Sequence, residues 1–544
     1  MATSNRDSQT SGRRRHRHQN VQPPDDLKPP AAGLQSSSPP VLYIHPAKQG
    51  LEFKAEDQTF GRPYGLFPLG LPALINNLRQ HGIEVQGVNH PLEKQLNQNF
   101  RLDNWLHARR GAKVILIDMH WYEHCYGAVE TARFCKQVLP EAWTVLGGLS
   151  ASGFAREILE NFPVVDFIVR GDAESPLLNL VQLLLQSGPV PDPRALADIP
   201  NLSYRTPQAE AVLENPVAYT AATHDLDSLD FVNIDFLDHY RQYYVHEYVV
   251  TDLQKARAAL ETPAPYTGRW VCTARGCKFN CSYCGGGRSA HKRLAGRVGL
   301  VVRSPDKVVE DLVRLRQLGV MQASISWDLA ELGQDYWQAV FDGMRREKLK
   351  IGLYNEFFQM PDLEFVKALA EVGDPEHSAV AITPLSGNER VRRLNGKHYS
   401  TEELFDLLEI LSRYKMYLLI YFSLNLPGET RQVFAETVDL AKEIYDFYPK
   451  SYLKILNTVH TIDPLSPMNV NAGKFGLSSH MMTFMDYYAY CRDTGRQDPH
   501  ARAGMRRGYE MAGRDTADME AMVAAWDAAR QGRESSWWPV PLGW

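Results

Sequence analysis

The chain has 544 residues, which is enough for two or three domains that each bury a core of their own. Its formal net charge of −5 and its 44% hydrophobic residues create no strong field for nucleic acid or a membrane surface. No run of about 18 apolar residues predicts a membrane span, and the first residues lack the apolar core of a signal peptide. We therefore expect neither nucleic acid nor a membrane among its partners.

Residues 1–38 are polar and carry a basic stretch at 13–18. This composition predicts a disordered tail, with targeting or a nucleic-acid contact as the alternative. Strand and helix patterns then alternate through residues 39–187, with a helical pattern at 71–81. A short apolar run at 41–45 and β-like runs at 84–88, 113–117, 143–146 and 166–169 predict five strands in this region. We predict a doubly wound, flavodoxin-like parallel sheet.

Ligands of such sheets bind where the strands end. The fourth predicted strand ends at Gly147 and Gly148, and the fifth is followed by the polar segment 170–174. Glycines there allow a ligand to approach the backbone closely, although plain turn chemistry would also place glycine at these points. Residues 188–265 read as a connector packed over this first domain.

A second alternating block covers residues 266–460. Its predicted strands are 270–273, 323–327, 351–354, 378–383, 417–424 and 452–456, and helical patterns such as 305–318 and 401–414 lie between them. Six such units predict a partial, TIM-like (β/α)6 barrel with its chemistry at the strand ends, where Tyr354, Asn355 and Glu356 could face a ligand. Residues 461–544 read as a helical region whose aromatic end packs across the barrel mouth.

Four of the seven cysteines lie within residues 272–284. Clustered thiols in a long chain are typical of metal ligands in a reducing compartment, so we expect a cytoplasmic protein. Cys277, Cys281 and Cys284 have the spacing C-x3-C-x2-C directly after the first barrel strand. Three thiolates suit a [4Fe–4S] cluster with one open iron at the barrel mouth. The alternative, a structural zinc site, needs Cys272 or His291 as a fourth ligand.

The cysteine motif, with Tyr283 before its last cysteine, resembles that of the radical S-adenosylmethionine (SAM) superfamily. The resemblance implies that the open iron chelates the amino and carboxylate groups of SAM, and that reduction yields a 5′-deoxyadenosyl radical. It further implies SAM contacts at positions that match, with substitutions, the superfamily's later motifs. The implied SAM-binding residues are Tyr283, Asp328, Ser386, Lys397 and Asn425, the last standing where relatives carry glycine.

The segments 145–151 and 165–174 resemble the V-x-G-G-x-x-A and V-D-x-V-V-x-G-E-x-E motifs of cobalamin-dependent radical SAM enzymes. The loop 46–68 should then face the lower side of the corrin, with Phe67 a further candidate near cobalt. Cobalamin proteins that ligate cobalt through histidine carry an Asp-x-His-x-x-Gly signature after the first strand. Here Asp118-x-His120 follows the third predicted strand, so we expect no histidine ligand to cobalt. The implied cobalamin-binding residues are Arg62, Tyr64, His120, Trp121, Gly147, Gly148, Arg170, Gly171, Asp172 and Glu174.

The resemblance implies a class B methyltransferase that methylates an unactivated or heteroaromatic carbon of a small molecule. It is greatest to the C-methyltransferases of natural-product and antibiotic biosynthesis. Its cofactors would be the [4Fe–4S] cluster, SAM and methylcobalamin, and its partners a small-molecule substrate, free or carrier-bound, and a flavodoxin- or ferredoxin-type electron donor. The alternatives are a non-methylating enzyme with the same cofactors, such as a ring-contracting or porphyrin-type cyclase, and a non-catalytic sensor or carrier.

Overall fold

The computed structural model describes residues 39–48, 50–51, 66–206, 211–249, 266–494 and 508–540. All of these belong to one compact unit that begins at Ser37. The predictions for residues 1–38, Arg62, Tyr64 and Trp544 fall outside the described residues. Within the described ranges, no helix is long and apolar enough to cross a membrane.

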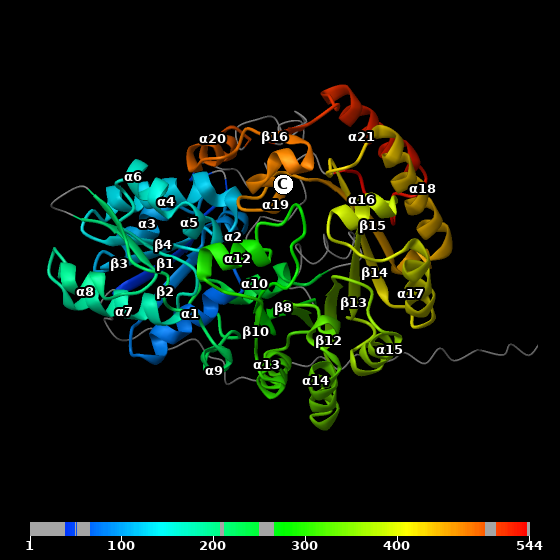
Figure 1. Ribbon diagram of the computed structural model, residues 1–544. Helices are drawn as coiled ribbons and strands as arrows, with labels where there is room; N and C mark the ends of the chain where they lie inside the picture. Colours follow the sequence, from blue (N-terminus) through cyan, green and yellow to red (C-terminus); the bar gives the residue numbers. More distant parts are fainter. Residues whose placement is uncertain are drawn as a thin grey trace, which may run out of the picture. The chain divides into compact units, whose positions relative to one another are not determined.

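The first sheet has seven strands in the order β2-β1-β3-β4-β5-β6-β7 (Figure 1). Its first five strands are parallel, and their order 2-1-3-4-5 is that of a flavodoxin-like fold. They are β1 (Val41–His45), β2 (Val85–Asn89), β3 (Val114–Asp118), β4 (Trp143–Gly147) and β5 (Phe167–Val169). This confirms the predicted parallel sheet, with the strands within one residue or so of their predicted bounds.

Helices cover both faces of this sheet. Alternate residues of β1 enter two different hydrophobic cores, with Val41 and Tyr43 in one and Leu42 and Ile44 in the other. The helices of this half are α1 (Gly70–Gln80), α2 (His90–Leu96), α3 (Leu102–His107), α4 (Cys125–Val138), α5 (Leu149–Gly153), α6 (Ala155–Asn161) and α7 (Glu174–Gln186). Burial on both faces explains why β1, β3 and β5 are largely apolar.

Two further strands extend the sheet beyond the predicted domain boundary at residue 187. β6 (Leu202–Arg205) pairs with β5 and β7 (Val212–Glu214) pairs with β6, both antiparallel. The region predicted as a connector therefore adds strands to the first domain. It also contains α8 (Pro193–Ala197), α9 (Thr223–Asp227) and α10 (Tyr240–His246). Between α9 and α10 the chain bonds to the other edge of the sheet, where Gly87 N donates to the carbonyl oxygen of Phe236 at 2.7 Å.

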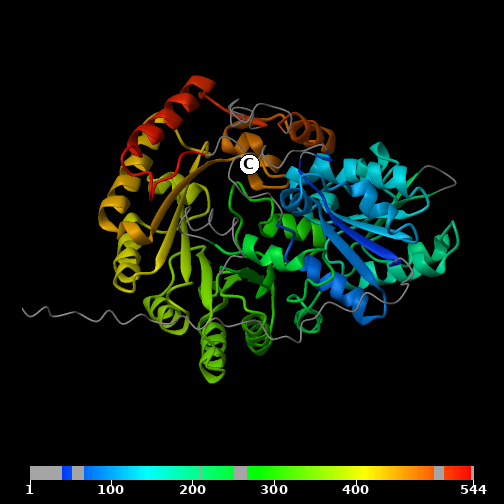
Figure 2. The same ribbon diagram turned by 180° about the vertical axis from the view of Figure 1, so that it is seen from behind.

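The second sheet has six parallel strands in the order β15-β14-β13-β12-β11-β8. They are β8 (Gly268–Val271), β11 (Gln322–Ile325), β12 (Gly352–Phe357), β13 (Ala379–Leu385), β14 (Tyr417–Leu424) and β15 (Leu453–Val459). The helices between them are α13 (Pro305–Gln317), α14 (Gln334–Arg346), α15 (Leu363–Val372), α16 (Glu389–Leu394), α17 (Thr401–Arg413) and α18 (Arg431–Phe447). Seen from behind, the larger helices lie along one side of the strands (Figure 2), as in the predicted partial barrel.

The C-terminal region is mainly helical, as predicted, and also contains a short hairpin. It contains α19 (Pro467–Val470), α20 (Phe484–Thr494), α21 (Thr516–Ala529) and an antiparallel pair formed by β16 (Leu477–Ser479) and β17 (Tyr509–Met511). The described part of the aromatic end, Trp537 and Trp538, lies along a sheet edge and not across the mouth. Trp537 forms a parallel bridge with Ile455 of the edge strand β15, and Trp538 N donates to the Ile455 carbonyl oxygen at 2.9 Å. These two residues cover part of an edge of the sheet, beside which the described residues place no further strand.

Candidate active site

The cysteine loop, residues 277–287, leads from the short strand β9 (Ala274–Gly276) into α12 (Arg288–Ala295). Cys284 N donates to the Cys281 carbonyl oxygen at 3.3 Å, and Arg288 N donates to that of Phe279 at 2.8 Å. The side chain of Asn280 accepts from Ser289 N at 3.1 Å and so fixes the start of α12. All three cysteines are partly exposed and free of disulfides. The loop therefore presents three accessible thiols within eight residues.

The ends of β11 and β12 hold the first half of this loop. The Phe279 ring lies 6.2 Å from that of Trp327, which follows β11, and 6.2 Å from that of Phe358, which follows β12. Lys278 Nζ donates to the carbonyl oxygen of Glu331 at 2.8 Å and forms an ion pair with its side chain. These contacts place Cys277 beside the carboxyl ends of the second and third barrel strands.

The ends of the later strands hold the second half of the loop. The Tyr283 ring stacks at 4.5 Å on that of His460, which follows β15. Gly285 N donates to Asp463 Oδ2 at 3.1 Å, and Ser282 Oγ donates to the Asn395 side chain. A Cβ on Gly396 would lie 2.9 Å from Cys281 Sγ, so only glycine fits there. The thiols are thereby held where the six parallel strands end, which is where barrels carry their chemistry.

The surroundings favour neutral thiols when no metal is bound. Burial raises the pKa of Cys277 and raises that of Cys284 to about 12. Thiolates at these positions therefore need a strong positive partner, which a metal cluster supplies. Lys397 is a buried cation in this neighbourhood; burial lowers its pKa, while Cys281 and Glu356 raise it. The donor set and its partial exposure fit a cubane held by three cysteines.

Neither candidate for a fourth zinc ligand joins the three cysteines. Cys272 is buried in a separate core with Ala73 and Phe231. His291 lies among the charges of Arg297, Asp172 and Arg275, and burial lowers its pKa. Across the described ranges, no three His, Cys, Asp or Glu side chains form a site for a single metal ion.

The residues predicted to bind SAM lie at the ends of β11, β13 and β14 or beside the cysteines. Lys397 Nζ donates to the Phe358 carbonyl oxygen at 2.9 Å, which leaves donor capacity for a ligand. Ser386 is fully buried and its hydroxyl lies 3.2 Å from that of Thr437. Both oxygens of Asp328 are used within the protein, by Asn355 Nδ2 and by the backbone N–H groups of residues 330 and 358. Asp328 therefore joins two strand ends, and a direct SAM contact by it stays a prediction.

Asn425 ends β14 with a φ of 73°, in the left-handed region that glycine and asparagine tolerate best. This explains why asparagine can stand where relatives carry glycine. Glu429 Oε2 accepts from the backbone N–H of Asn425 at 2.8 Å. Arg514, from the C-terminal region, donates to Asn425 Oδ1 at 2.8 Å. Sequence reasoning did not include Arg514, His460 or Asp463 in this site.

The inner face of the six-stranded sheet carries both buried and partly exposed side chains. Tyr354 is buried, and its hydroxyl donates to Glu356 Oε1 at 2.8 Å; the ring of Trp270 lies edge-on to it at 6.0 Å. Glu356 and Tyr421 are partly exposed on the same face. Asn355, on the opposite face, bonds to Asp328 instead. Of the three residues predicted at this strand end, two thus face the barrel interior.

The first domain carries a polar cluster at its switch point, where β1 and β3 lie side by side. His45 Nδ1 lies 2.9 Å from Asp118 Oδ1, to which the Tyr43 hydroxyl donates at 2.7 Å. Burial would raise the pKa of Asp118, but these neighbours hold it below its usual range. His45 is fully buried, and its Nε2 has no hydrogen-bond partner. Such an unpartnered atom at a switch point fits a ligand-binding edge, although the sequence analysis did not single out His45.

Of the residues predicted to bind cobalamin, His120, Trp121 and the two glycines meet at this same edge. Burial lowers the pKa of His120 to about 4, and its ring lies 5.1 Å from that of Trp121. Gly148 has a φ of 115°, and a Cβ there would lie 2.7 Å from the backbone of His120. A Cβ on Gly147 would meet only the Val169 carbonyl oxygen, at 3.7 Å. Gly148 is thus required by the fold, whereas Gly147 leaves space for a ligand.

The segment 170–174 bonds mainly to protein. Asp172 pairs with Arg275, at 3.2 Å, and with Arg297; Glu174 Oε1 lies 2.6 Å from Arg275 Nη2. Arg170 donates to the carbonyl oxygen of residue 215 and lies 3.7 Å from the carboxylate of residue 214. A Cβ on Gly171 would lie 3.0 Å from Ala295, at the end of α12. The segment therefore joins the first sheet to the β9–α12 region, and its predicted contact with cobalamin stays a prediction.

Phe67 was a further candidate near cobalt. Its ring stacks at 4.2 Å on that of Tyr243 and lies 5.4 Å from the guanidinium of Arg269. These contacts bury it in the hydrophobic core, so the structure does not place it in a ligand site.

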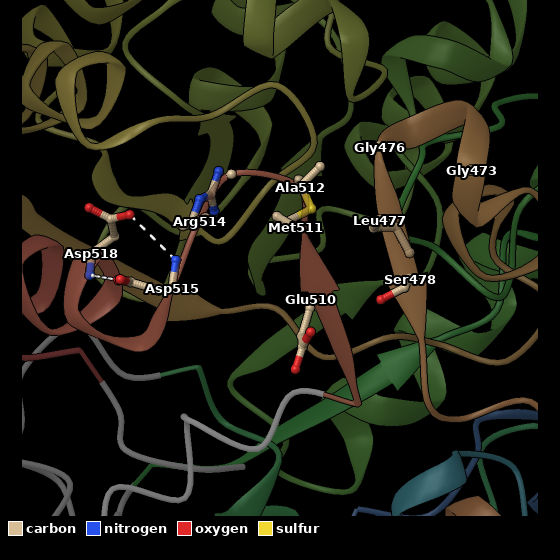
Figure 3. Close-up of a pocket in the computed structure, with 11 residues that line it drawn as sticks. Gly473, Gly476, Leu477, Ser478, Glu510, Met511, Ala512, Arg514, Asp515 and Asp518 are labelled. Carbon is tan, nitrogen blue, oxygen red and sulfur yellow. Dashed lines mark hydrogen bonds between the residues drawn. The ribbon is translucent and has the colours of Figure 1, made fainter.

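A cavity of about 680 Å³ lies beside the β16–β17 hairpin (Figure 3). Its lining includes Ser478 and Glu510 on the hairpin strands and Arg514, Asp515 and Asp518 at the start of α21. Asp515 and Asp518 bond to each other's backbone N–H groups and cap that helix. None of the three motif cysteines (277, 281 and 284) lines this cavity, but Arg514 belongs both to it and to the turn after β14.

Residues 271–441 match the family model of the radical SAM superfamily. This part of the chain is a radical SAM domain. The match begins at the end of β8 and ends within α18, so it contains the cysteine loop and the first five strand ends of the barrel.

Similarity to known proteins extends beyond this domain. The chain is 24% identical over 298 residues to the hopanoid C-3 methylase of Methylococcus capsulatus, which covers 54% of the chain and 48% of that relative. It is 29% identical over 191 residues to an anaerobic magnesium-protoporphyrin IX monomethyl ester cyclase of Cereibacter sphaeroides, covering 35% of the chain and 26% of the cyclase. The chain thus spans about half, or less, of the length of these curated relatives.

Among solved structures, the radical SAM methyltransferase TsrM of Kitasatospora setae has a similar fold. Its structure with bound cobalamin and a [4Fe–4S] cluster superposes with a TM-score of 0.61 at 16% identity, covering 91% of this chain and 89% of TsrM. A second structure, with tryptophan substrate and the SAM analogue aza-SAM, gives a TM-score of 0.57 at 16% identity over 81% and 78% of the two chains. The predicted fold class, a doubly wound parallel sheet followed by a partial barrel, is therefore confirmed.

Proposed function

We propose that the protein is a cobalamin-dependent radical SAM methyltransferase that methylates an unactivated or heteroaromatic carbon of a small-molecule substrate. One observation carries the proposal. Three accessible thiols are held at the carboxyl ends of a six-stranded parallel sheet, in the same compact unit as a flavodoxin-like domain with a polar switch point. A radical SAM barrel alone has no need of the second domain, whereas methyl transfer through a corrin needs both.

When bound, the cluster, SAM and cobalamin would supply the electron, the 5′-deoxyadenosyl radical and the methyl group. Cys277, Cys281 and Cys284 would hold the cluster. Lys397 would offer its remaining N–H groups to the carboxylate of SAM, because it is a buried cation beside Cys281. Gly147, His120 and Trp121 would line the cobalamin site at the end of β4 and β3. The protein's own contribution is to orient these groups and to exclude water from them.

The substrate is proposed to meet the partly open inner face of the barrel sheet near Glu356. TsrM acts on tryptophan and the methylase of Methylococcus on a hopanoid, so the family resemblance sets a small organic molecule, free or carrier-bound, as the expected class. A flavodoxin- or ferredoxin-type protein would supply the electron, and a reducing, cytoplasmic setting would keep the thiols free.

Anaerobic reconstitution of the full chain tests the proposal. We expect about four irons and one corrinoid per chain. Turnover should then give methylated product together with S-adenosylhomocysteine and 5′-deoxyadenosine. A chain that binds four irons and corrinoid but yields 5′-deoxyadenosine without S-adenosylhomocysteine would contradict methyl transfer.

That last outcome would favour a second function, a ring-forming or ring-contracting reaction with the same cofactors. The 29% identity to the cyclase supports this alternative, although it covers only 35% of the chain. A search for a cyclised product under the same conditions distinguishes the two. Absence of any SAM cleavage would instead favour a sensor or carrier.

A further inference from the structure

The segment that contains the cysteine loop and α12 carries a surplus of positive charge. Residues 274–303 include seven Lys and Arg residues and no Asp or Glu, although the whole chain has a net charge of −5. Acidic side chains from other parts of the fold compensate four of the seven, namely Arg275, Lys278, Arg297 and Arg303. The other three form no ion pair with any residue that the structure describes, and we call them the basic face of α12: Arg288, Lys292 and Arg293.

The three side chains of the basic face lie on one exposed side of α12. A helix has 3.6 residues per turn, so positions 288 and 292 share a side and position 293 lies next to them. The opposite side packs against the first domain, where Leu294 is buried near Gly153 and Ala295 near Gly171. The apolar side therefore holds α12 in place, and the basic face is left exposed to solvent.

Hydrogen bonds attach the start of α12 to the cysteine loop. Arg288 N donates to the Phe279 carbonyl oxygen at 2.8 Å. The backbone N–H and the hydroxyl of Ser289 both donate to Asn280 Oδ1, at 3.1 and 2.7 Å. Arg288 follows Cys284 by only four residues. The basic face thus begins beside the three thiols and is fixed to the loop that carries them.

We propose that the basic face of α12 is the docking site of an acidic electron-donor protein of the flavodoxin or ferredoxin type. The inference rests on the proposed function, in which the three cysteines hold a cluster that accepts one electron. The donor is oxidised by one electron and the cluster is reduced by one, and no bond forms or breaks. Because electron transfer between proteins slows steeply with distance, the donor has to dock close to the cysteine loop.

Complementary charge suits this kind of partner. A donor that leaves after each electron needs a small interface and a fast encounter, and exposed charges raise the rate of encounter more than the lifetime of the complex. An acidic carrier protein that presents the substrate is the competing occupant. The substrate is proposed to bind near Glu356 on β12, which is not part of α12, so the structure favours the electron donor.

A triple variant, Arg288→Gln with Lys292→Gln and Arg293→Gln, tests the docking site. The substitutions are on the surface, so iron content and Tm should not change. Reduction of the cluster by an acidic, reduced flavodoxin should be about tenfold slower at low salt, followed anaerobically by stopped-flow absorbance of the reconstituted full chain. Added salt should slow the unsubstituted chain until the two rates converge, because salt screens exposed charges.

Two controls separate docking from other effects. Photoreduced 5-deazaflavin, a small uncharged reductant, should reduce the triple variant and the unsubstituted chain at the same rate. Arg316→Gln with Lys348→Gln and Lys350→Gln makes the same change in net charge with exposed residues that lie before β11 and β12, at the opposite ends of the barrel strands. This matched variant should react with flavodoxin like the unsubstituted chain.

Three results would overturn the inference. The first is an unchanged flavodoxin rate in the triple variant at low salt; if the KM for a carrier-bound substrate rises instead, the basic face binds the carrier protein. The second is an equal loss in the matched variant, which would reflect net charge alone. The third is an equal loss with 5-deazaflavin, which would mean that the substitutions change the cluster itself.

Failure of this inference can be told apart from failure of the proposed function. If neither reductant gives an unsubstituted chain that cleaves SAM, the proposed function fails. If the chain reduced by 5-deazaflavin cleaves SAM and flavodoxin reduces the triple variant at the full rate, only the inference fails.

Discussion

The cysteine loop and the segment 170–174 each follow a short strand, β9 and β5, and both contain glycine and polar side chains. They differ in what satisfies those groups. The three thiols are partly exposed, with Lys397 as a buried cation in their neighbourhood, whereas Asp172 and Glu174 are buried in ion pairs with Arg275 and Arg297. The cysteine loop therefore keeps side chains that can bind a ligand, whereas the polar side chains of the segment 170–174 hold two parts of the protein together.

Removing one thiol gives the largest expected effect. Cys281→Ala should reduce the iron content of the reconstituted chain from about four to near zero, because two thiolates hold a cubane poorly. Iron analysis and the absorbance of the cluster measure this. Cys272→Ala is the matched control and should keep its iron, since Cys272 lies in a separate core. Loss of iron in both variants would show that the cluster uses a fourth cysteine.

Removing one arginine at the other strand end should affect stability instead. Arg297→Met leaves Asp172 buried with only part of its charge compensated, which should lower the free energy of unfolding by about 3 kcal/mol. Urea unfolding of the full chain measures this change, and a double variant with Asp172→Asn should recover part of it. Corrinoid content should stay the same in the double variant; its loss would mean that Asp172 also binds cobalamin.

Gly147 and Gly148 are neighbours in the first domain, but we expect Gly148 to matter for stability and Gly147 for cobalamin binding. Gly148→Ala should lower the free energy of unfolding by about 2 kcal/mol, because the φ of 115° at this position and the nearby His120 backbone exclude a Cβ. Gly147→Ala should hardly change the Tm, yet it should lower the corrinoid content if cobalamin approaches that backbone. Equal corrinoid content in the unsubstituted chain and in Gly147→Ala would remove Gly147 from the cobalamin site.

The smallest expected effect, taken per pH unit, concerns the ionisation of Asp328. Burial raises the pKa of Asp328 from its ordinary value near 4 to about 7. Its protonated form is therefore the one that the fold favours, so its contribution to stability is present below pH 4 and is lost as the pH rises towards 7. The free energy of unfolding should fall by up to about 1.4 kcal/mol per pH unit in this range. The free energy of unfolding of Asp328→Asn should lack this pH dependence. The same pH profile in Asp328→Asn and in the unsubstituted chain would contradict the prediction.

Most strands of the two sheets could be predicted because they are buried and largely apolar, and the cysteine loop because its spacing is local. β6 and β7 were missed as parts of the sheet because they are four and three residues long and lie in a polar stretch. The arginine partners of Asp172 lie more than 100 residues downstream, and Arg514 lies 89 residues beyond Asn425. No local pattern could reveal them, since the fold alone brings these segments together.

The pairing of Trp537 with β15 has a consequence for how the protein behaves in concentrated solution. An open edge of a parallel sheet offers unpaired N–H and C=O groups to any other extended chain, and such edges promote association between molecules. Residues 536 and 538 bond to both backbone groups of Ile455 and cover that part of the edge. Residues 536–538 should therefore reduce aggregation by occupying this edge. A chain shortened before residue 536 should precipitate at a lower protein concentration than the full chain.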